Sequence, residues 1–248
     1  MGNNTQIENA LAAARHVLAL RYEGAACAFA AGSIIRGEGT ASSDIDLVVV
    51  FDRVDRAWRE SFVDHGFPVE AFVHDPETLA WFINNDAKSG HPLMLDMIAS
   101  GTLMGTDVVR ADTLQAAARS QLAAGPRPFA GEHCDSIRYQ ITDLLDDLRG
   151  ERSPAEIRAI AAQLYQPLAD LVLLGRGTWS GKGKWIPKLL GKLDQELAQG
   201  FDDAFRMAAN GECAAIVGFV ERELAPHGGP YFAGDKRMAL AEMRHRPD

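Results

Sequence analysis

The amino-acid sequence predicts an α+β protein in two parts, a region of mixed strands and helices followed by a helical bundle. Three observations lead to this prediction. Short apolar or β-branched runs typical of strands occur in the first half of the chain, and helical periodicity fills the second half. Between them, GPRPFAG at residues 125–131 is the clearest Pro/Gly break. We therefore expect domains at residues 1–125 and 126–248.

The first part begins with a helix and three strands. Apolar residues recur every three or four positions over 5–22, which predicts an amphipathic helix. The apolar run 25–32 and the β-branched run DIDLVVVF at 44–51 predict strands. Residues 33–43 between them are rich in Gly, Ser and Thr and predict a turn or short helix followed by a loop. The alternating segment FPVEAFVH at 67–74 predicts the third strand.

A helix start follows the third strand. Asp75 is suited to cap a helix and Pro76 to its first turn, so we expect the helix to continue through 77–86. A second helical stretch covers 92–99. GTLMGTD at 101–107 then predicts an edge strand or hairpin.

The second part has helical periodicity almost throughout. The predicted helices are 132–149, 154–174, 186–199, 201–209 and 212–225. The segment PHGGPYFAGDKR, residues 226–237, predicts a loop, and we expect the last five residues to be frayed. No internal repeat is present.

Composition and charge narrow the class of protein. The 248 residues are 47% hydrophobic and 24% charged, as in an ordinary globular protein, with a net charge of −9. Such an acidic chain lacks the positive field that non-specific binding to nucleic acid or anionic membranes needs. The sequence has no run of about 18 apolar residues, and its first residues lack a basic start followed by an apolar core, so we expect neither a membrane span nor a signal peptide. The three cysteines, Cys27, Cys134 and Cys213, are far apart and fit a reducing cytoplasm.

Two aspartates at the start of the second predicted strand stand out. Asp44 and Asp46 are two residues apart, so both side chains project from the same face of a strand. Neighbouring carboxylates repel each other unless a cation neutralises them. Mg²⁺ prefers oxygen ligands and is often held by one or two carboxylates together with substrate phosphates. The pair therefore predicts a site for one or two Mg²⁺ ions.

Glu70 supplies a third acid on the next predicted strand. If that strand lies beside 44–51, Glu70 joins Asp44 and Asp46 around the metal. It could instead act as general base for an incoming hydroxyl, or be a solvent-facing residue of an edge strand.

The turn after the first strand is suited to hold an anion. Gly32 allows the backbone to approach a phosphate closely, and the following amides and the Ser33 hydroxyl can donate hydrogen bonds to it. Ser42 and Ser43 either cap the turn or contact the same anion. Arg36 either reaches a phosphate or is a surface residue.

The stretch GSIIRGEGTASSDIDLVVVF, residues 32–51, resembles the signature of the DNA polymerase beta-like nucleotidyltransferase superfamily, in which GS and a spacer precede D-x-D. Such a domain followed by helices is similar to the antibiotic nucleotidyltransferases of the kanamycin, streptomycin and lincosamide types. The resemblance implies a small mixed sheet flanked by helices, with the bundle closing over the cleft. It implies transfer of a nucleoside monophosphate, which we expect to be AMP from ATP, to an acceptor hydroxyl with release of pyrophosphate.

The same resemblance implies roles for individual residues. It places Gly32 and Ser33 at the triphosphate, Asp44 and Asp46 on Mg²⁺, and Glu70 as the third carboxylate.

A lysine-rich segment in the second part provides further candidates. GKGKWIPK at 181–188 leads to Lys192, and Lys184, Lys188 and Lys192 are spaced to share one face of a helix. We expect Lys184 or Lys188 to bind the triphosphate; the alternative is a solvated lysine face.

Three other groups have both a functional and a structural interpretation. Tyr139 and Asp143, with Asp146 or Asp147, bind a cationic acceptor, provide an alternative base, or form a solvated helix face. Trp179 and Trp185 either stack on a base or belong to the core. His74 shares the parity of Glu70 and either lines the site or is structural.

Several acceptors fit the chemistry. An antibiotic polycation would require an acidic pocket between the domains, with which the net charge agrees, and a lincosamide a more apolar one. A protein hydroxyl, as in toxin–antitoxin nucleotidyltransferases, is the alternative acceptor. A non-catalytic nucleotide-binding module is a third interpretation, but it would have little need for both repelling aspartates. Without a basic stripe, we do not expect a nucleic-acid acceptor.

Overall fold

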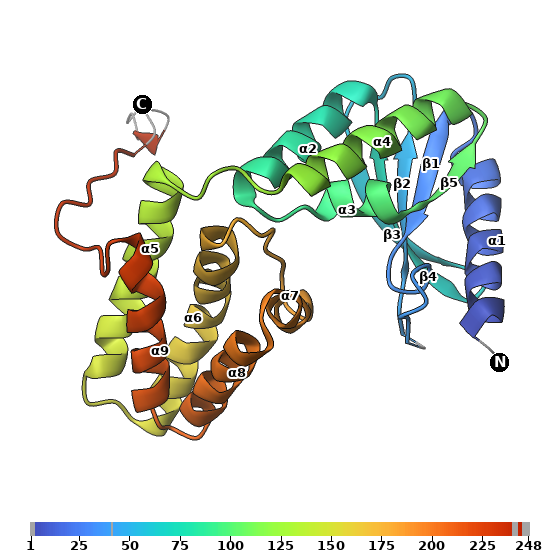
Figure 1. Ribbon diagram of the computed structural model, residues 1–248. Coiled ribbons are helices and arrows are strands. Elements are labelled where there is room, and N and C mark those ends of the chain that lie inside the picture. The colour runs from blue at the N-terminus through green and yellow to red at the C-terminus, as the bar shows by residue number, and fades with distance from the viewer. Residues whose placement is uncertain (1–2, 41, 240–242, 245–248) are drawn as a thin grey trace. The chain divides into compact units, whose positions relative to one another are not determined.

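The computed structural model describes residues 3–40, 42–239 and 243–244. Of the five C-terminal residues for which we expect fraying, all but Arg244 lie outside this range. Contacts between residues divide the chain into two compact units, residues 1–127 and 128–248 (Figure 1). The first unit contains the sheet, and the second contains helices α5 to α9.

The first unit is built on a five-stranded mixed sheet, which confirms the predicted α+β class. Its strands lie in the order β3-β4-β2-β1-β5. Their bounds are Cys27–Ala31 for β1, Ile45–Val50 for β2, Trp58–Asp64 for β3, Phe67–His74 for β4 and Thr102–Gly105 for β5. The pair β2–β4 is parallel and the other pairs are antiparallel. Asp44, predicted within a strand, lies one residue before β2.

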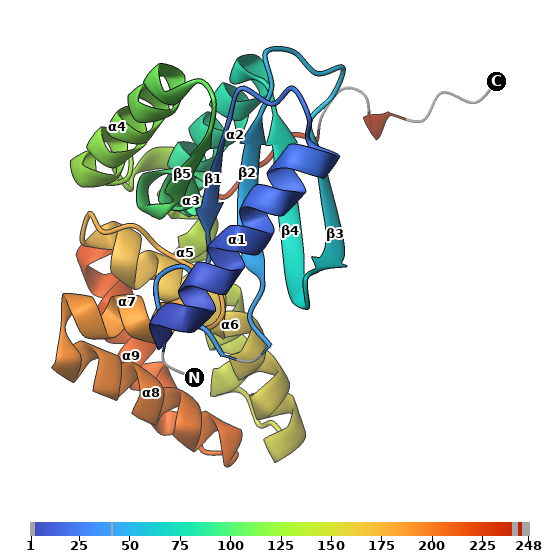
Figure 2. The same cartoon turned by 90° about the vertical axis from the view of Figure 1, so that its right-hand side faces the viewer.

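Helices cover the two faces of this sheet. Helix α1 (Asn3–Arg21) crosses one face, as Figure 2 shows, and packs on the inward side chains of β2 such as Leu47 and Val49. Helices α2 (Pro76–Ser89), α3 (Leu93–Ser100) and α4 (Val108–Ala124) lie on the other face (Figure 1). Because side chains alternate along a strand, Asp46 and Glu70 point away from α1. One face of the sheet therefore packs an apolar core against α1, and the other carries Asp46 and Glu70.

The helix start predicted at Asp75 is confirmed. The Asp75 side chain accepts a hydrogen bond from the Thr78 amide at 2.8 Å, and the Thr78 hydroxyl accepts one from the Asp75 amide at 3.0 Å. This reciprocal capping box satisfies two amide groups at the end of β4.

The predictions for the first unit missed two elements. Strand β3, WRESFVD, is an edge strand whose residues are all exposed or partly buried, so its apolar alternation is weak. Helix α4 is rich in small alanines, and Ala111 and Ala118 are the apolar residues it buries. Neither segment carries the strong periodicity on which prediction from sequence relies.

In its described residues, the second unit is a bundle of five α-helices, followed by the short 3-10 helix η1 (Ala225–His227). The five α-helices are α5 (Gly131–Arg149), α6 (Pro154–Gly175), α7 (Trp185–Leu193), α8 (Gln195–Ala209) and α9 (Ala214–Leu224). Their apolar faces share one core, in which Leu145, Leu168 and Ile216 are fully buried. The prediction of one helix over residues 186–199 was wrong, because two helices, α7 and the first part of α8, cover this range. Asp194 ends α7 and caps α8, accepting from the Leu197 amide at 2.9 Å, so the predicted helix 201–209 is the second half of α8.

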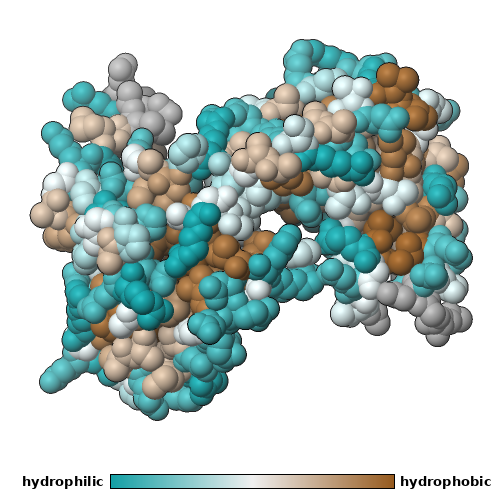
Figure 3. Space-filling model, viewed as in Figure 1, coloured by the Kyte–Doolittle hydropathy of each residue, from teal (hydrophilic) through white to brown (hydrophobic). Residues whose placement is uncertain are grey.

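Hydrophilic residues cover much of the visible surface of each unit, and apolar patches lie between them (Figure 3). Among the described helices, none combines the length and the apolar character that crossing a membrane requires.

Candidate active site

The sheet brings the three predicted acids together. Asp46, the second residue of β2, lies opposite Ala31 on β1 and opposite Glu70 on β4. Neighbouring strands are about 4.8 Å apart, so the parallel ladder places the Asp46 and Glu70 side chains next to each other on one face. Asp44 precedes β2 and projects from the same end of the sheet. Strand β4 is an interior strand that pairs with β3 on one side and β2 on the other, so Glu70 does not lie on an edge strand, as one interpretation of the sequence had it.

The carboxylates of these residues can share one cation. One oxygen from each of Asp44, Asp46 and Glu70 lies within 4.8 Å of the others. Asp44 is exposed, and Asp46 and Glu70 are partly buried, so the cluster opens to solvent. A donor set made entirely of carboxylate oxygen fits a hard divalent ion such as Mg²⁺, which also neutralises the mutual repulsion of the acids. The three residues could therefore hold a divalent metal.

The Gly32 turn lies directly against this cluster. Gly32 has a φ of +95°, in the left-handed region that favours glycine. A Cβ atom on this residue would lie 2.8 Å from Oδ2 of Asp46 and 3.2 Å from the carbonyl oxygen of Asp44. Both the backbone conformation and the space thus require glycine. The close approach places the turn and the carboxylates in one site.

Ser33 and Ser43 join the two ends of the loop between β1 and β2. The Ser33 hydroxyl donates to Oγ of Ser43 at 3.0 Å, and Ser43 Oγ also accepts from the Thr40 amide at 2.9 Å. The Glu38 amide donates to the Ser33 carbonyl at 2.8 Å and closes the turn after β1. These bonds hold the Ser33 hydroxyl beside the start of β2, where an anion on the turn would meet it.

Two arginines near the site form ion pairs that the sequence analysis did not predict. Arg59 of β3 forms an ion pair with Glu70, with Nη1 and Oε1 3.0 Å apart. Arg36 of the loop pairs with Asp96 of α3 at 3.4 Å. The partner of Glu70 was missed because strand β3 was missed. The pair of Arg36 and Asp96 was missed because the two residues are 60 positions apart in the sequence, and no local pattern predicts such a contact.

Burial raises the pKa of Asp96, and the charge of Arg36 opposes that rise. Arg36 therefore forms an ion pair within the first unit and is not simply a surface residue. Its contact with a phosphate stays a prediction. The Arg59 ion pair balances part of the negative charge of the acid cluster.

The lysine candidates lie in the second unit. Lys184 immediately precedes α7, and Lys188 and Lys192 lie on its exposed side, whereas Ile186 and Leu190 face the core. The ammonium of Lys188 is 4.9 Å from the ring centroid of Trp185, a cation–π contact. Gly32, Ser33, Ser43 and the three acids lie together within the first unit, and the binding of the triphosphate by Lys184 or Lys188 stays a prediction.

The acidic face of α5 is largely occupied by contacts within the second unit. Asp146 pairs with Arg149 at 2.8 Å and Asp147 with Arg152 at 2.7 Å. Tyr139 stacks on Phe232, with ring centroids 5.8 Å apart. These contacts favour the structural interpretation of Asp146, Asp147 and Tyr139.

His74 is a structural residue at the end of β4. Its side chain is only 2% exposed, and its ring contacts Phe82 edge-on at a centroid distance of 4.9 Å. Within the described part of the chain, its Nδ1 has no hydrogen-bond partner. Burial lowers the pKa of His74 from the usual 6.5, with a smaller opposing effect of Asp75.

This lowered pKa predicts a loss of stability in mild acid. Below about pH 6.5 the unfolded chain binds a proton at His74 that the folded chain resists, so the free energy of unfolding falls as pH falls. The slope from one such group is at most about 1.4 kcal/mol per pH unit. In thermal melts from pH 7.5 to 5.5, we expect wild type to lose more stability than His74→Leu. Parallel curves for the two proteins would contradict the prediction.

One comparison with known proteins gives a match that includes the residues of this site. The family model described as "Nucleotidyltransferase domain" matches residues 18–96, a segment that contains the Gly32 turn and all three acids. The matched segment, which is less than half of the chain, is similar to nucleotidyltransferase domains, and this similarity is consistent with transfer of nucleoside monophosphates in general.

Two further comparisons are less informative. No curated protein gives a significant match. A crystal structure of a nucleotidyltransferase-like protein from Exiguobacterium sibiricum 255-15 is similar at 11% identity and a TM-score of 0.48, covering 87% of this chain and 74% of that one.

Proposed function

We propose that the protein transfers a nucleoside monophosphate, AMP from ATP, to a hydroxyl group of a small molecule such as an antibiotic. The observation that carries the proposal is the arrangement of Asp44, Asp46 and Glu70, whose oxygens lie within 4.8 Å of one another, against the left-handed Gly32 turn. An anion site next to a carboxylate cluster is what a metal-bound triphosphate needs. The nucleotidyltransferase family match covers this segment.

In this proposal the residues of the first unit bind and orient the nucleotide. The backbone amides of the Gly32 turn donate to phosphate oxygens, and the Ser33 hydroxyl, which donates to Ser43 Oγ at 3.0 Å in the free protein, turns its proton to a phosphate oxygen when the nucleotide binds. Asp44, Asp46 and Glu70 would hold Mg²⁺, which when bound neutralises charge on the phosphates and on the leaving pyrophosphate.

The transfer step is an in-line displacement. The acceptor oxygen forms a bond to the α-phosphorus, and the bond from that phosphorus to the bridging oxygen of pyrophosphate breaks, its electron pair leaving with pyrophosphate. The hydroxyl proton passes to Glu70 or to water, so Glu70 serves as metal ligand or as general base. Positioning and electrostatic stabilisation supply most of the rate in such reactions.

The proposal is tested by asking what becomes labelled. The full chain is incubated with Mg²⁺ and each of the four NTPs, labelled at the α-phosphate, with aminoglycosides, lincosamides and candidate protein acceptors. We expect label from ATP in a small molecule, and none with the Asp44→Asn/Asp46→Asn double variant. Label in a protein would instead identify a protein-modifying enzyme. Failure of the chain to bind any NTP in the presence of Mg²⁺ would contradict nucleotidyl transfer altogether.

We further propose that Lys184 and Lys188 bind the triphosphate. The support is their exposure and the concentration of positive charge at the start of α7 in an acidic protein. A hydrogen bond to a charged group contributes about 1.5–3 kcal/mol, so Lys184→Ala/Lys188→Ala should raise KM for the NTP about tenfold or more. Lys192→Ala, on the same helix, is the matched control and should leave KM near wild type. An unchanged KM in the double variant would reject the assignment.

A further inference from the structure

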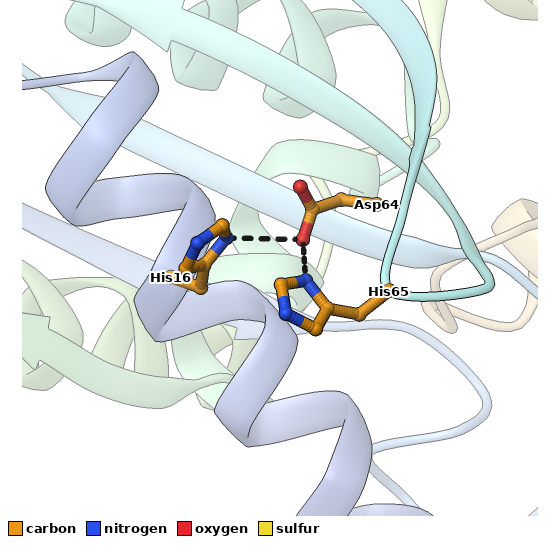
Figure 4. Close-up of side chains that lie close together, drawn as sticks. All are labelled: His16, Asp64 and His65. Atoms are coloured by element: carbon orange, nitrogen blue, oxygen red, sulfur yellow. Dashed lines mark hydrogen bonds and ion pairs between the residues drawn. The ribbon is translucent and has the colours of Figure 1, made fainter.

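Figure 4 shows a second cluster of possible metal ligands, made of His16, Asp64 and His65. It lies on the opposite face of the sheet from Asp46 and Glu70. His16 comes from α1, Asp64 is the last residue of β3, and His65 is the first residue of the turn that leads to β4. Asp64 shares its face of β3 with Phe62, which packs into the core beneath α1. Glu70 lies opposite Ser61 and therefore on the other face. The two clusters are separate.

The two imidazoles converge on a single carboxylate oxygen. Nδ1 of His16 lies 3.3 Å and Nδ1 of His65 2.5 Å from Oδ1 of Asp64 (Figure 4). The two rings meet edge-on with centroids 4.3 Å apart. Ligand atoms from the three residues lie within 4.8 Å of one another, so small side-chain rotations would place them around one ion. The hydrogen bond from His65 is the largest cause that lowers the pKa of Asp64.

The backbone conformation of the turn between β3 and β4 does not require a histidine at position 65. His65 and Gly66 have φ values of +48° and +80° and join β3 to β4 as a two-residue hairpin. Two successive left-handed residues are the requirement of a type I′ turn, for which Asn-Gly is the preferred pair. Histidine adopts this conformation more readily than most residues, but asparagine adopts it better. His65 therefore occupies a position where the fold alone would favour another residue.

We propose that His16, Asp64 and His65 form a binding site for a transition-metal ion of the Zn²⁺ class. Two imidazoles and one carboxylate are a ligand set that such ions accept, whereas Mg²⁺ prefers oxygen alone. Three protein ligands leave at least one coordination position for water. The side chains of His16 and His65 are 43% and 57% exposed, so an ion reaches them from solvent. A bound ion would link α1 to the β3–β4 hairpin.

Zn²⁺ binding to the full chain tests the site. Titration calorimetry is done on the Asp44→Asn/Asp46→Asn variant, which weakens the oxygen cluster as a competing site. We expect one Zn²⁺ per chain, not displaced by a large excess of Mg²⁺. His16→Ala and His65→Asn should each weaken binding at least about tenfold, the scale on which metal sites respond to loss of a supporting group. His65→Asn retains a residue suited to the turn, and circular dichroism checks that both variants fold.

A matched control separates this site from adventitious binding to histidine. His133→Ala, in the second unit, removes an imidazole outside the cluster and should leave Zn²⁺ affinity unchanged. With Cu²⁺ as the probe, electron paramagnetic resonance should show hyperfine coupling from two imidazole nitrogens, reduced to one in either histidine variant. No stoichiometric Zn²⁺ binding, or equal binding in parent, His16→Ala and His65→Asn, would overturn the proposal and leave a hydrogen-bonded link between α1 and the hairpin. Because the readout is binding, neither result depends on nucleotidyl transfer.

Discussion

Asp46→Asn is expected to reduce nucleotidyl transfer by at least about 10³-fold while leaving the fold intact. Asp46 lies in the middle of the candidate site, opposite Glu70 on β4 and against the Gly32 turn. Asparagine keeps the size of the side chain but removes the negative charge that would hold a divalent ion. The same change relieves repulsion among the carboxylates of the metal-free protein, so the melting temperature should stay the same or rise.

The measurement is steady-state turnover with labelled ATP and the acceptor found by the panel, together with thermal melts. Asp55→Asn is the matched control, because Asp55 is an exposed aspartate in the loop after β2 and outside the acid cluster. It should retain wild-type activity. Wild-type turnover in Asp46→Asn would remove the assignment of the acids as catalytic ligands, whereas a large fall in melting temperature would show that Asp46 has a structural role.

Gly32→Ala is expected to damage both stability and activity. The left-handed backbone at Gly32 costs an alanine about 1–2 kcal/mol. The new Cβ would also approach Oδ2 of Asp46 to 2.8 Å and the Asp46 amide to 3.3 Å, so the carboxylate must move. Displacements of about 1 Å in a catalytic site can cost about 10² in rate. We therefore expect a turnover loss of about that size with a weaker affinity for NTP.

Gly24→Ala separates these two effects. Gly24 has a φ of +83°, but a Cβ there would meet no atom within 4 Å. It should show the backbone strain as a lower free energy of unfolding in urea and retain its activity. If Gly24→Ala and Gly32→Ala lose stability equally and both keep full turnover, the close contact between the turn and Asp46 has no functional role.

Much of the site could be predicted from local sequence. The alternation of side chains along a strand predicts that Asp44 and Asp46 lie close together without knowledge of the rest of the fold, and their oxygens do so although Asp44 precedes β2. A glycine after an apolar run predicts a tight turn, and the Asp75-Pro76 pair predicts a helix start. Each of these inferences needs only neighbouring residues, because the backbone conformation at such positions is set by short-range sterics and hydrogen bonds.

The elements missed from sequence are those whose stability comes from distant partners. Strand β3 forms because its backbone pairs with β4, with Ser61 opposite Glu70. Its own apolar alternation is too weak to predict a strand. The ion pair of Arg59 with Glu70 depends on that pairing and could not be foreseen without it. The division between α7 and α8 at Asp194 was missed because apolar periodicity continues on both sides of the capping residue.

The sequence alone determined the α+β class, the acidic character and the kinds of side chain available for binding phosphate and metal. Only the tertiary structure decided which of those side chains meet. Parallel pairing of β2 with β4 puts Asp46 beside Glu70, and packing of α1 on the opposite face brings His16 to Asp64 and His65. The physical reason is that strand order and helix packing depend on burial of apolar surface between segments far apart in the chain, a contribution that no local pattern records.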